Sequence, residues 1–134
     1  MKFASKKIIN SNLNLSSIIE LLEAKPLVDN YDPDVVPESF FAADLMSDIL
    51  AFVDSNALIL TGLVNIQSIR TAQIADAVGV IYVRGKIPEP ETVELAKKIN
   101  IPIFVTKNSM FECCGRIYLA LYYPELIAKK SDEK

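Results

Sequence analysis

Three short apolar runs, each followed by a segment with helical character, constrain the fold of this chain more than any other feature. The runs are 57–61, 78–83 and 101–105. Their residues are apolar at successive positions, which is typical of strands buried on both faces of a sheet. The helical segments that follow them are 66–77, 88–99 and a stretch that begins after Ser109 and ends near Tyr122. Strands that alternate with helices of about ten residues predict a mainly parallel sheet flanked by helices, in a single three-layer α/β domain.

The N-terminal part of the chain adds a helix and a short strand to this pattern. A helix is expected over 15–24, where Ser17 and Glu20 have the spacing of a capping box. A short strand is expected over 25–28. We therefore treat residues 1–33 as an N-terminal helix and lead-in.

The main α/β domain is expected to span 34–126. Its first strand is predicted over 40–43, and Asp44 is of a residue type suited to capping the helix predicted over 45–52. Residues 127–134 are mostly charged and are expected to form a mobile tail.

Charge and hydropathy exclude several classes of protein. The 134 residues carry a formal net charge of −3, which argues against general binding of nucleic acids, because phosphate neutralisation needs a basic surface. No apolar run approaches the roughly 18 residues that span a bilayer, and the N-terminus does not read as a signal peptide. We expect a cytoplasmic protein. The mean hydropathy of +0.26 is high for a small monomer, and apolar surface hidden in an oligomer would explain it.

The chain contains no histidine and only two cysteines. The absence of histidine removes the commonest general base and the commonest metal ligand. Cys113 and Cys114 are adjacent and lie in the middle of the last helix, so we interpret both as buried structural thiols and expect no disulfide. We predict no catalytic residues, no metal and no cofactor.

A ligand is expected where the parallel strands end. In open α/β sheets, ligands bind outside the carboxyl ends of the strands, near helix N-termini that can hold an anion. The segments 61–65, 84–86 and 106–109 lie there and carry hydroxyl, amide and cationic groups. The candidate ligand-binding residues are Ser47, Thr61, Gly62, Asn65, Arg70, Arg84, Gly85, Thr106 and Ser109.

Each candidate also has a purely structural interpretation. A role in turns alone would explain Gly62 and Gly85, because neither belongs to a complete phosphate-binding motif. Ser109 has capping-box spacing with Glu112, and Asn65 is placed to cap the helix that follows it. An ordinary surface ion pair is as good an interpretation of Arg84 as ligand binding.

Two helices carry residues that indicate close packing. Small side chains form a stripe on the helix over 66–77, which indicates a closely packed neighbour, either within the chain or on a symmetric partner. They are Ser68, Thr71, Ala72 and Ala75. Gly115 lowers the helix propensity of the last helix, so it too is expected to allow close packing.

The runs 44–50, 60–72, 83–86 with Pro88, 95–96, 101–103 and 110–118 lie within a span that covers more than half of the chain. In their order and spacing together they resemble a stand-alone member of the DRTGG domain family. The chain departs from the family at Val36–Phe40, where the glycine-rich motif that names the family should lie. If that motif shapes a ligand loop in relatives, the site is altered or lost in this chain.

The resemblance implies an α/β fold related to the N-terminal domain of HPr kinase/phosphorylase, usually dimeric, with a regulatory role. The leading hypothesis is therefore a non-catalytic regulatory domain, homodimeric, that senses a small polar or anionic ligand, such as a nucleotide, at the strand ends. A partner enzyme is a further expectation. The alternative is a protein-interaction or oligomerisation module without a ligand. A metal-free enzyme acting on phosphorylated metabolites is the third and weakest hypothesis.

Overall fold

The computed structural model describes residues 10–29 and 31–127. The helices are α1 (Leu15–Leu21), α2 (Met46–Phe52), α3 (Ile66–Ile74), α4 (Pro90–Lys98) and α5 (Met110–Tyr122). The strands are β1 (Lys25–Pro26), β2 (Ser39–Ala42), β3 (Ala57–Thr61), β4 (Gly79–Tyr82) and β5 (Ile103–Val105). The expected tail over 127–134 lies outside the described residues except for Ile127.

The sheet has five strands in the order β1-β5-β4-β3-β2. The four strands β2 to β5 are parallel and pair in the order of the chain. The short β1 pairs antiparallel with β5, with Lys25 opposite Val105. The prediction of a mainly parallel sheet is confirmed.

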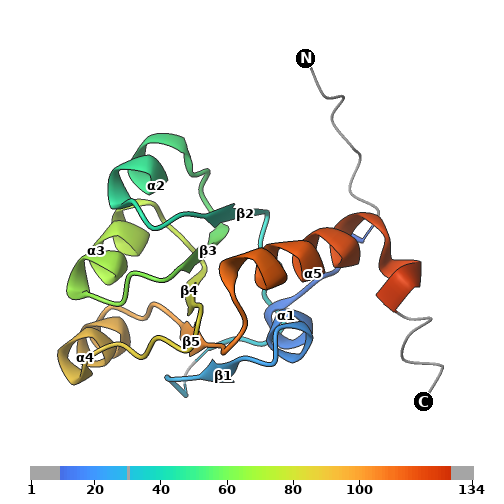
Figure 1. Cartoon of the computed structure of the whole chain (residues 1–134). Helices are drawn as coiled ribbons and strands as arrows, with labels where there is room; N and C mark the ends of the chain where they lie inside the picture. Colours follow the sequence, from blue (N-terminus) through green and yellow to red (C-terminus); the bar gives the residue numbers. More distant parts are fainter. Residues whose placement is uncertain (1–9, 30, 128–134) are drawn as a thin grey trace.

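The helices form a layer on each face of this sheet (Figure 1). The helices α2, α3 and α4 lie on one face, and α1 and α5 lie on the other. Successive residues of each strand face opposite layers, so the core has two halves. Ile59, Val80 and Tyr82 belong to the half beneath α3 and its neighbours. Leu60 and Ile81 belong to the half beneath α1 and α5.

The predicted N-terminus of α1 is correct, but its predicted cap is wrong. Asn14 is the N-cap residue, and its side chain accepts a hydrogen bond of 2.9 Å from the backbone N–H of Ser17. Ser17 is therefore the third residue of the helix, not its cap. Residues 13–28 also contribute to the core through Leu13, Leu15 and Val28, so the lead-in is packed against the rest of the domain.

The small side chains of α3 fit close neighbours within the chain. Ser68, Thr71 and Ala72 are buried. The Ser68 hydroxyl lies 2.6 Å from the hydroxyl of Tyr82 and donates to the carbonyl of Asn65. Packing inside the domain therefore explains the stripe. The same explanation is wrong for Gly115, which is exposed and would bring an added Cβ within 4 Å of nothing.

Candidate functional site

The ends of β2, β3 and β4 are joined by a group of polar residues, which we name the rim cluster: Asp44, Thr61, Gly62 and Arg84. The carboxylate of Asp44 accepts a hydrogen bond of 2.7 Å from the backbone N–H of Gly62 and one of 3.3 Å from the hydroxyl of Thr61. Its other oxygen lies 3.6 Å from the guanidinium of Arg84. One carboxylate thus connects three neighbouring strands.

Asp44 was expected to cap α2, and that expectation is wrong. The N-cap position belongs to Leu45, and no side chain caps the helix. Asp44 lies two residues after the end of β2, as Arg84 lies two residues after the end of β4, so the reasoning that selected Arg84 also applied to Asp44. Because aspartate is a common capping residue, we interpreted Asp44 as a cap and did not include it among the candidate ligand-binding residues.

Gly62 makes room for the side chain of Arg84. A Cβ atom built on Gly62 would lie 2.9 Å from Cζ and 3.1 Å from Nε of Arg84, with Nη2 nearer still. Gly62 has no left-handed φ, so its lack of a side chain serves this close approach rather than a turn. Gly85, with a φ of 70°, does serve a turn.

The backbone of Arg84 adopts a left-handed conformation, with a φ of 64°. The other non-glycine residues of positive φ in the described parts of the chain are Glu23, Asn56, Asp76 and Asn100. Three of them, Glu23, Asp76 and Asn100, lie just after helices, where this conformation commonly ends a helix. Arg84 follows a strand instead, at the candidate site.

The gap between the carboxyl ends of β4 and β5 is closed. The chain passes from β4 to α4 on one face and from β5 to α5 on the other, an arrangement that normally opens a ligand crevice at the strand ends. Here the backbone N–H of Arg84 donates to the carbonyl of Asn108 at 2.8 Å, and that of Gly85 donates to the carbonyl of Thr106 at 2.9 Å. These two bonds occupy backbone N–H donors that we expected to be free to bind an anion.

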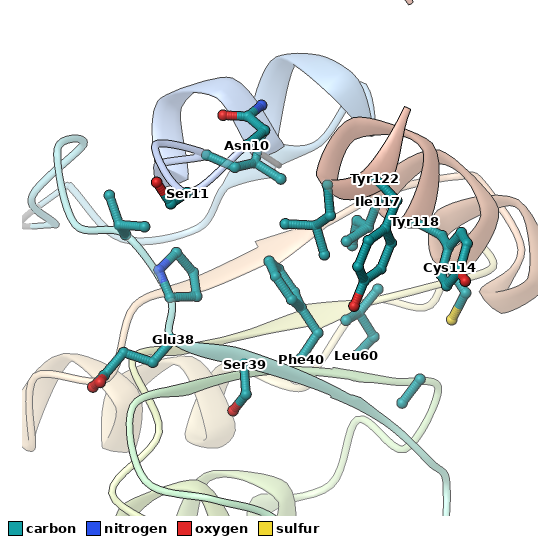
Figure 2. A pocket seen from close by; sticks show the side chains of 15 residues that line it. Asn10, Ser11, Glu38, Ser39, Phe40, Leu60, Cys114, Ile117, Tyr118 and Tyr122 are labelled. Carbon is teal, nitrogen blue, oxygen red and sulfur yellow. The ribbon is translucent and has the colours of Figure 1, made fainter. Parts of the chain in front are cut away.

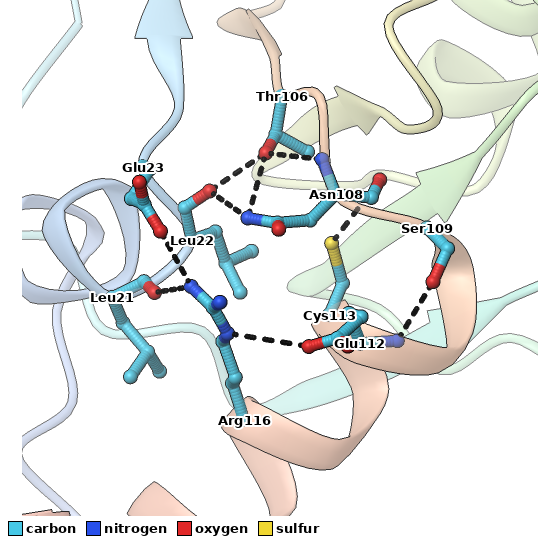
Figure 3. A network of polar contacts seen from close by, with 9 residues as sticks. All are labelled: Leu21, Leu22, Glu23, Thr106, Asn108, Ser109, Glu112, Cys113 and Arg116. Carbon is cyan, nitrogen blue, oxygen red and sulfur yellow. Dashed lines mark hydrogen bonds and ion pairs between the residues drawn. The ribbon is translucent and has the colours of Figure 1, made fainter.

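Thr106 and Asn108 bind the C-terminal end of α1 (Figure 3). The buried hydroxyl of Thr106 and the side-chain amide of Asn108 both donate to the carbonyl of Leu22, at 2.6 and 2.8 Å. Arg116 donates to the neighbouring carbonyl of Leu21 at 3.0 Å. Helix ends leave carbonyls without intrahelical partners, and these side chains supply them.

Ser109 is the N-cap of α5, as its capping-box spacing indicated. Its hydroxyl accepts a hydrogen bond of 3.1 Å from the backbone N–H of Glu112. The hydroxyls of Thr106 and Ser109 therefore already have structural partners within the domain.

The remaining candidates lie around the rim cluster. Asn65 is the exposed N-cap residue of α3, and its side chain makes no capping hydrogen bond. Ser47 and Arg70 are exposed on α2 and α3, and no hydrogen bond or ion pair joins either of them to the cluster within the described residues. The structure thus brings together Thr61, Gly62 and Arg84, with Asp44 added.

A second concavity, which we name the β2–α5 groove, was not predicted. It has a volume of about 800 Å³ and lies between the edge strand β2 and helix α5. Figure 2 shows Phe40 and Leu60 on its sheet side and Ile117 and Tyr118 on its helix side. Residues 36–40, where the resemblance predicts the glycine-rich motif of DRTGG domains, line it as well. It is mainly apolar, and its walls come from segments too far apart in sequence to be joined by a local pattern.

The chemistry available at these places is limited. Burial raises the pKa of the Cys113 thiol to about 11, which disfavours the nucleophilic thiolate. Cys114 is exposed, which corrects the expectation that both thiols are buried, and partial desolvation still raises its pKa. Among residues 10–29 and 31–127, no three or more acidic or cysteine side chains gather as metal ligands do. In the same residues, we find no helix with the length and apolarity needed to traverse a lipid bilayer.

Comparison with known proteins identifies a shared fold. No family model and no curated protein matches the sequence. Among solved structures, the chain is similar to the CBS and DRTGG domains from the regulatory region of a Clostridium perfringens pyrophosphatase, crystallised with its activator diadenosine tetraphosphate. The identity is 21%, the TM-score is 0.63, and the match covers 84% of this chain and 52% of that one. This chain therefore spans about half of that structure, and the fold expected from the resemblance to DRTGG domains is confirmed.

Proposed function

We propose that this chain is a non-catalytic regulatory domain that senses a small anionic ligand of the nucleotide class at the rim cluster. The observation that carries the proposal is the state of Arg84. Its backbone adopts a left-handed conformation and its guanidinium lies against Gly62, yet the ion pair that it forms within the described residues is a half-exposed one with Asp44. A guanidinium that lies at the strand ends and is only weakly paired is well suited to binding an anion.

The energies of the two interactions favour a phosphate group over the Asp44 carboxylate as the partner of the Arg84 guanidinium. The side chains of Arg84 and Asp44 are 49% and 53% exposed and lie 3.6 Å apart, and an exposed ion pair of this kind contributes at most about 1 kcal/mol. A phosphate group binds a guanidinium through two parallel hydrogen bonds, which is stronger and more directional. Asp44 would keep its hydrogen bond from Gly62 after the exchange.

Asp44 also narrows the class of ligand. A carboxylate beside the anion site repels a bare phosphate but accepts hydrogen bonds from hydroxyl or amino groups. A molecule that carries both phosphate and hydroxyl groups satisfies the two sides of the cluster, as nucleotides do. The nucleotide activator bound by the clostridial regulatory region supports this choice.

Calorimetry and thermal-shift measurements with adenine nucleotides, including diadenosine tetraphosphate, and with inorganic phosphate test the proposal. We expect at least one nucleotide to stabilise the protein and Arg84→Ala to abolish the effect. Lys97→Ala is the matched control, because Lys97 is 52% exposed and pairs with Glu94 at 3.8 Å on α4, away from the rim. The proposal fails if none of the nucleotides binds, or if binding survives Arg84→Ala.

We include in the proposal a homodimer, a regulated partner enzyme and a cytoplasmic location. The high mean hydropathy and several exposed apolar side chains support self-association. Free thiols at both cysteines support a reducing compartment. An interaction module without a ligand is the second candidate, favoured by the apolar β2–α5 groove.

A further inference from the structure

The helix α5 is apolar around nearly its whole circumference. It has 13 residues, of which only Glu112 and Arg116 are charged. These two lie 3.7 Å apart, and Arg116 also pairs with Glu23 at 2.9 Å. Both charged side chains therefore form ion pairs along one flank of the helix. The centre of the face opposite the core carries no charge, and Glu112, whose side chain is 57% exposed, lies at its border beside Leu119. A helix of this composition is normally buried on all sides.

The outward face nevertheless lies open to solvent in the single chain. Phe111 is 87% exposed, Tyr118 is 49% exposed and Leu119 is 37% exposed. Helical spacing places these residues around Gly115, within an arc of roughly 100°. Cys114, also exposed, borders the same face.

Packing within the described part of the chain does not explain Gly115. A Cβ atom at this position would meet nothing within 4 Å, so no neighbour within the described residues requires the glycine. The helix loses propensity by having it. A glycine in the middle of an exposed apolar helix face does allow a second helix to approach its backbone closely.

We infer that α5 of a second copy packs antiparallel on this face and crosses it at Gly115. Two-fold symmetry about Gly115 places Phe111, four residues before it, against the partner's Leu119, four residues after it, and makes the contact twice. The face is therefore complementary to itself. This inference rests on the homodimer in the proposed function and assigns its surface.

The exposed area suits a dimer of ordinary size. A standard interface buries roughly 800 Å² per partner, of which about 57% is apolar. Phe111, Tyr118 and Leu119 expose roughly 350 Å², if an aromatic side chain is taken as roughly 200 Å². The β2–α5 groove adds to the surface without a break, because Cys114 and Tyr118 border both.

Sedimentation equilibrium of the full chain tests the assignment. We expect a dimer at micromolar concentration, and we expect Phe111→Glu to weaken it about 30-fold or more, the loss typical of a central aromatic residue. Phe52→Glu is the matched control, because Phe52 is also a largely exposed phenylalanine, at 71%, and it lies on α2. This control should dimerise like the wild type.

Gly115→Ala gives a second and independent readout. The added methyl has free space in the single chain, so the melting temperature of the dilute monomer should not fall, while dimerisation should weaken. A dimer that tolerates both Phe111→Glu and Gly115→Ala would overturn the assignment of α5 and leave the homodimer standing. A wild-type monomer at all concentrations would overturn both, and neither result would alter the nucleotide test at Arg84.

Discussion

Thr106→Val separates a structural role of the strand-end hydroxyl from a role in ligand binding. Valine has nearly the same shape as threonine but lacks the hydroxyl, which in the native protein donates to the carbonyl of Leu22 at 2.6 Å and accepts from the N–H of Asn108 at 3.2 Å. We expect the variant to lose stability and to bind nucleotide as the wild type does.

The size of the loss follows from the partners that remain. The carbonyl of Leu22 keeps its hydrogen bond from the Asn108 amide, so it still has a donor. The free energy of unfolding should therefore fall only by the contribution of the lost bonds, about 1–2 kcal/mol. For a chain of 134 residues, the unfolding entropy of about 2.1 cal/mol/K per residue converts 1.5 kcal/mol into a fall in Tm of about 5 °C. Urea unfolding should show a lower midpoint with an unchanged m-value.

The double variant Thr106→Val with Asn108→Ala makes the test sharper. It removes both side-chain donors from the Leu22 carbonyl, so the pair should cost more than the sum of the single changes, by about 1 kcal/mol or more. The Asn108 amide also donates to the Thr106 hydroxyl at 3.3 Å, and because either single change removes this bond, it offsets part of the excess. A double variant that costs clearly less than the sum would contradict a dominant role of the shared acceptor in Figure 3. A loss of nucleotide affinity in Thr106→Val, with unchanged stability, would refute the structural assignment altogether.

Three further predictions concern Gly62, the thiols and alkaline pH. Gly62→Ala should change the free energy of unfolding by less than about 0.5 kcal/mol, because the far end of the Arg84 side chain is able to move aside. The displaced guanidinium should no longer bind nucleotide in calorimetry. Binding at wild-type affinity would contradict the proposed site. A thiol reagent at pH 8 should modify Cys114 in the folded protein, more slowly than a free cysteine because its pKa is raised, and Cys113 only on unfolding; equal rates at both thiols would contradict this. Burial raises the pKa of Tyr82 from 10.0 to about 12. The contribution of Tyr82 to stability is therefore complete below pH 10 and falls by about 2–3 kcal/mol as the pH rises to 12. In urea unfolding across this range, the free energy of unfolding should fall less steeply with pH in Tyr82→Phe than in the wild type.

The strands could be predicted from the sequence because burial on both faces leaves a direct signal. The run 57–61 coincides with β3, and the runs 78–83 and 101–105 contain β4 and β5. Burial on two faces requires apolar residues at successive positions, and few other structures impose this pattern in short runs. The ends of the helices were harder to predict. For α1, both Asn14 and Ser17 are good capping residues, and only the backbone geometry decides between them.

The candidate site could be predicted only in part, because its hydrogen bonds join segments that are distant in sequence. The sequence indicates that 84–86 and 106–109 meet at one edge of a parallel sheet. It does not indicate that backbone bonds from Arg84 and Gly85 close the gap between these segments. Nor does it indicate that Asn108 and Thr106 are both needed by the carbonyl of Leu22. Local patterns report the positions of donors, whereas their partners depend on the packing of α1.

Gly62 and Arg84 show how two ambiguous residues become informative once they are seen together. Glycine at position 84 would adopt the left-handed conformation without the strain that arginine incurs, about 1–2 kcal/mol. The chain places a guanidinium there instead, and it has a residue without a side chain at position 62, where any Cβ would collide with that guanidinium. The ion pair with Asp44 is too exposed and too long to offset such strain. The ion pair therefore does not explain why arginine occupies this position of the Val83–Lys86 turn, and the nucleotide experiment on Arg84→Ala tests the proposed ligand as the reason.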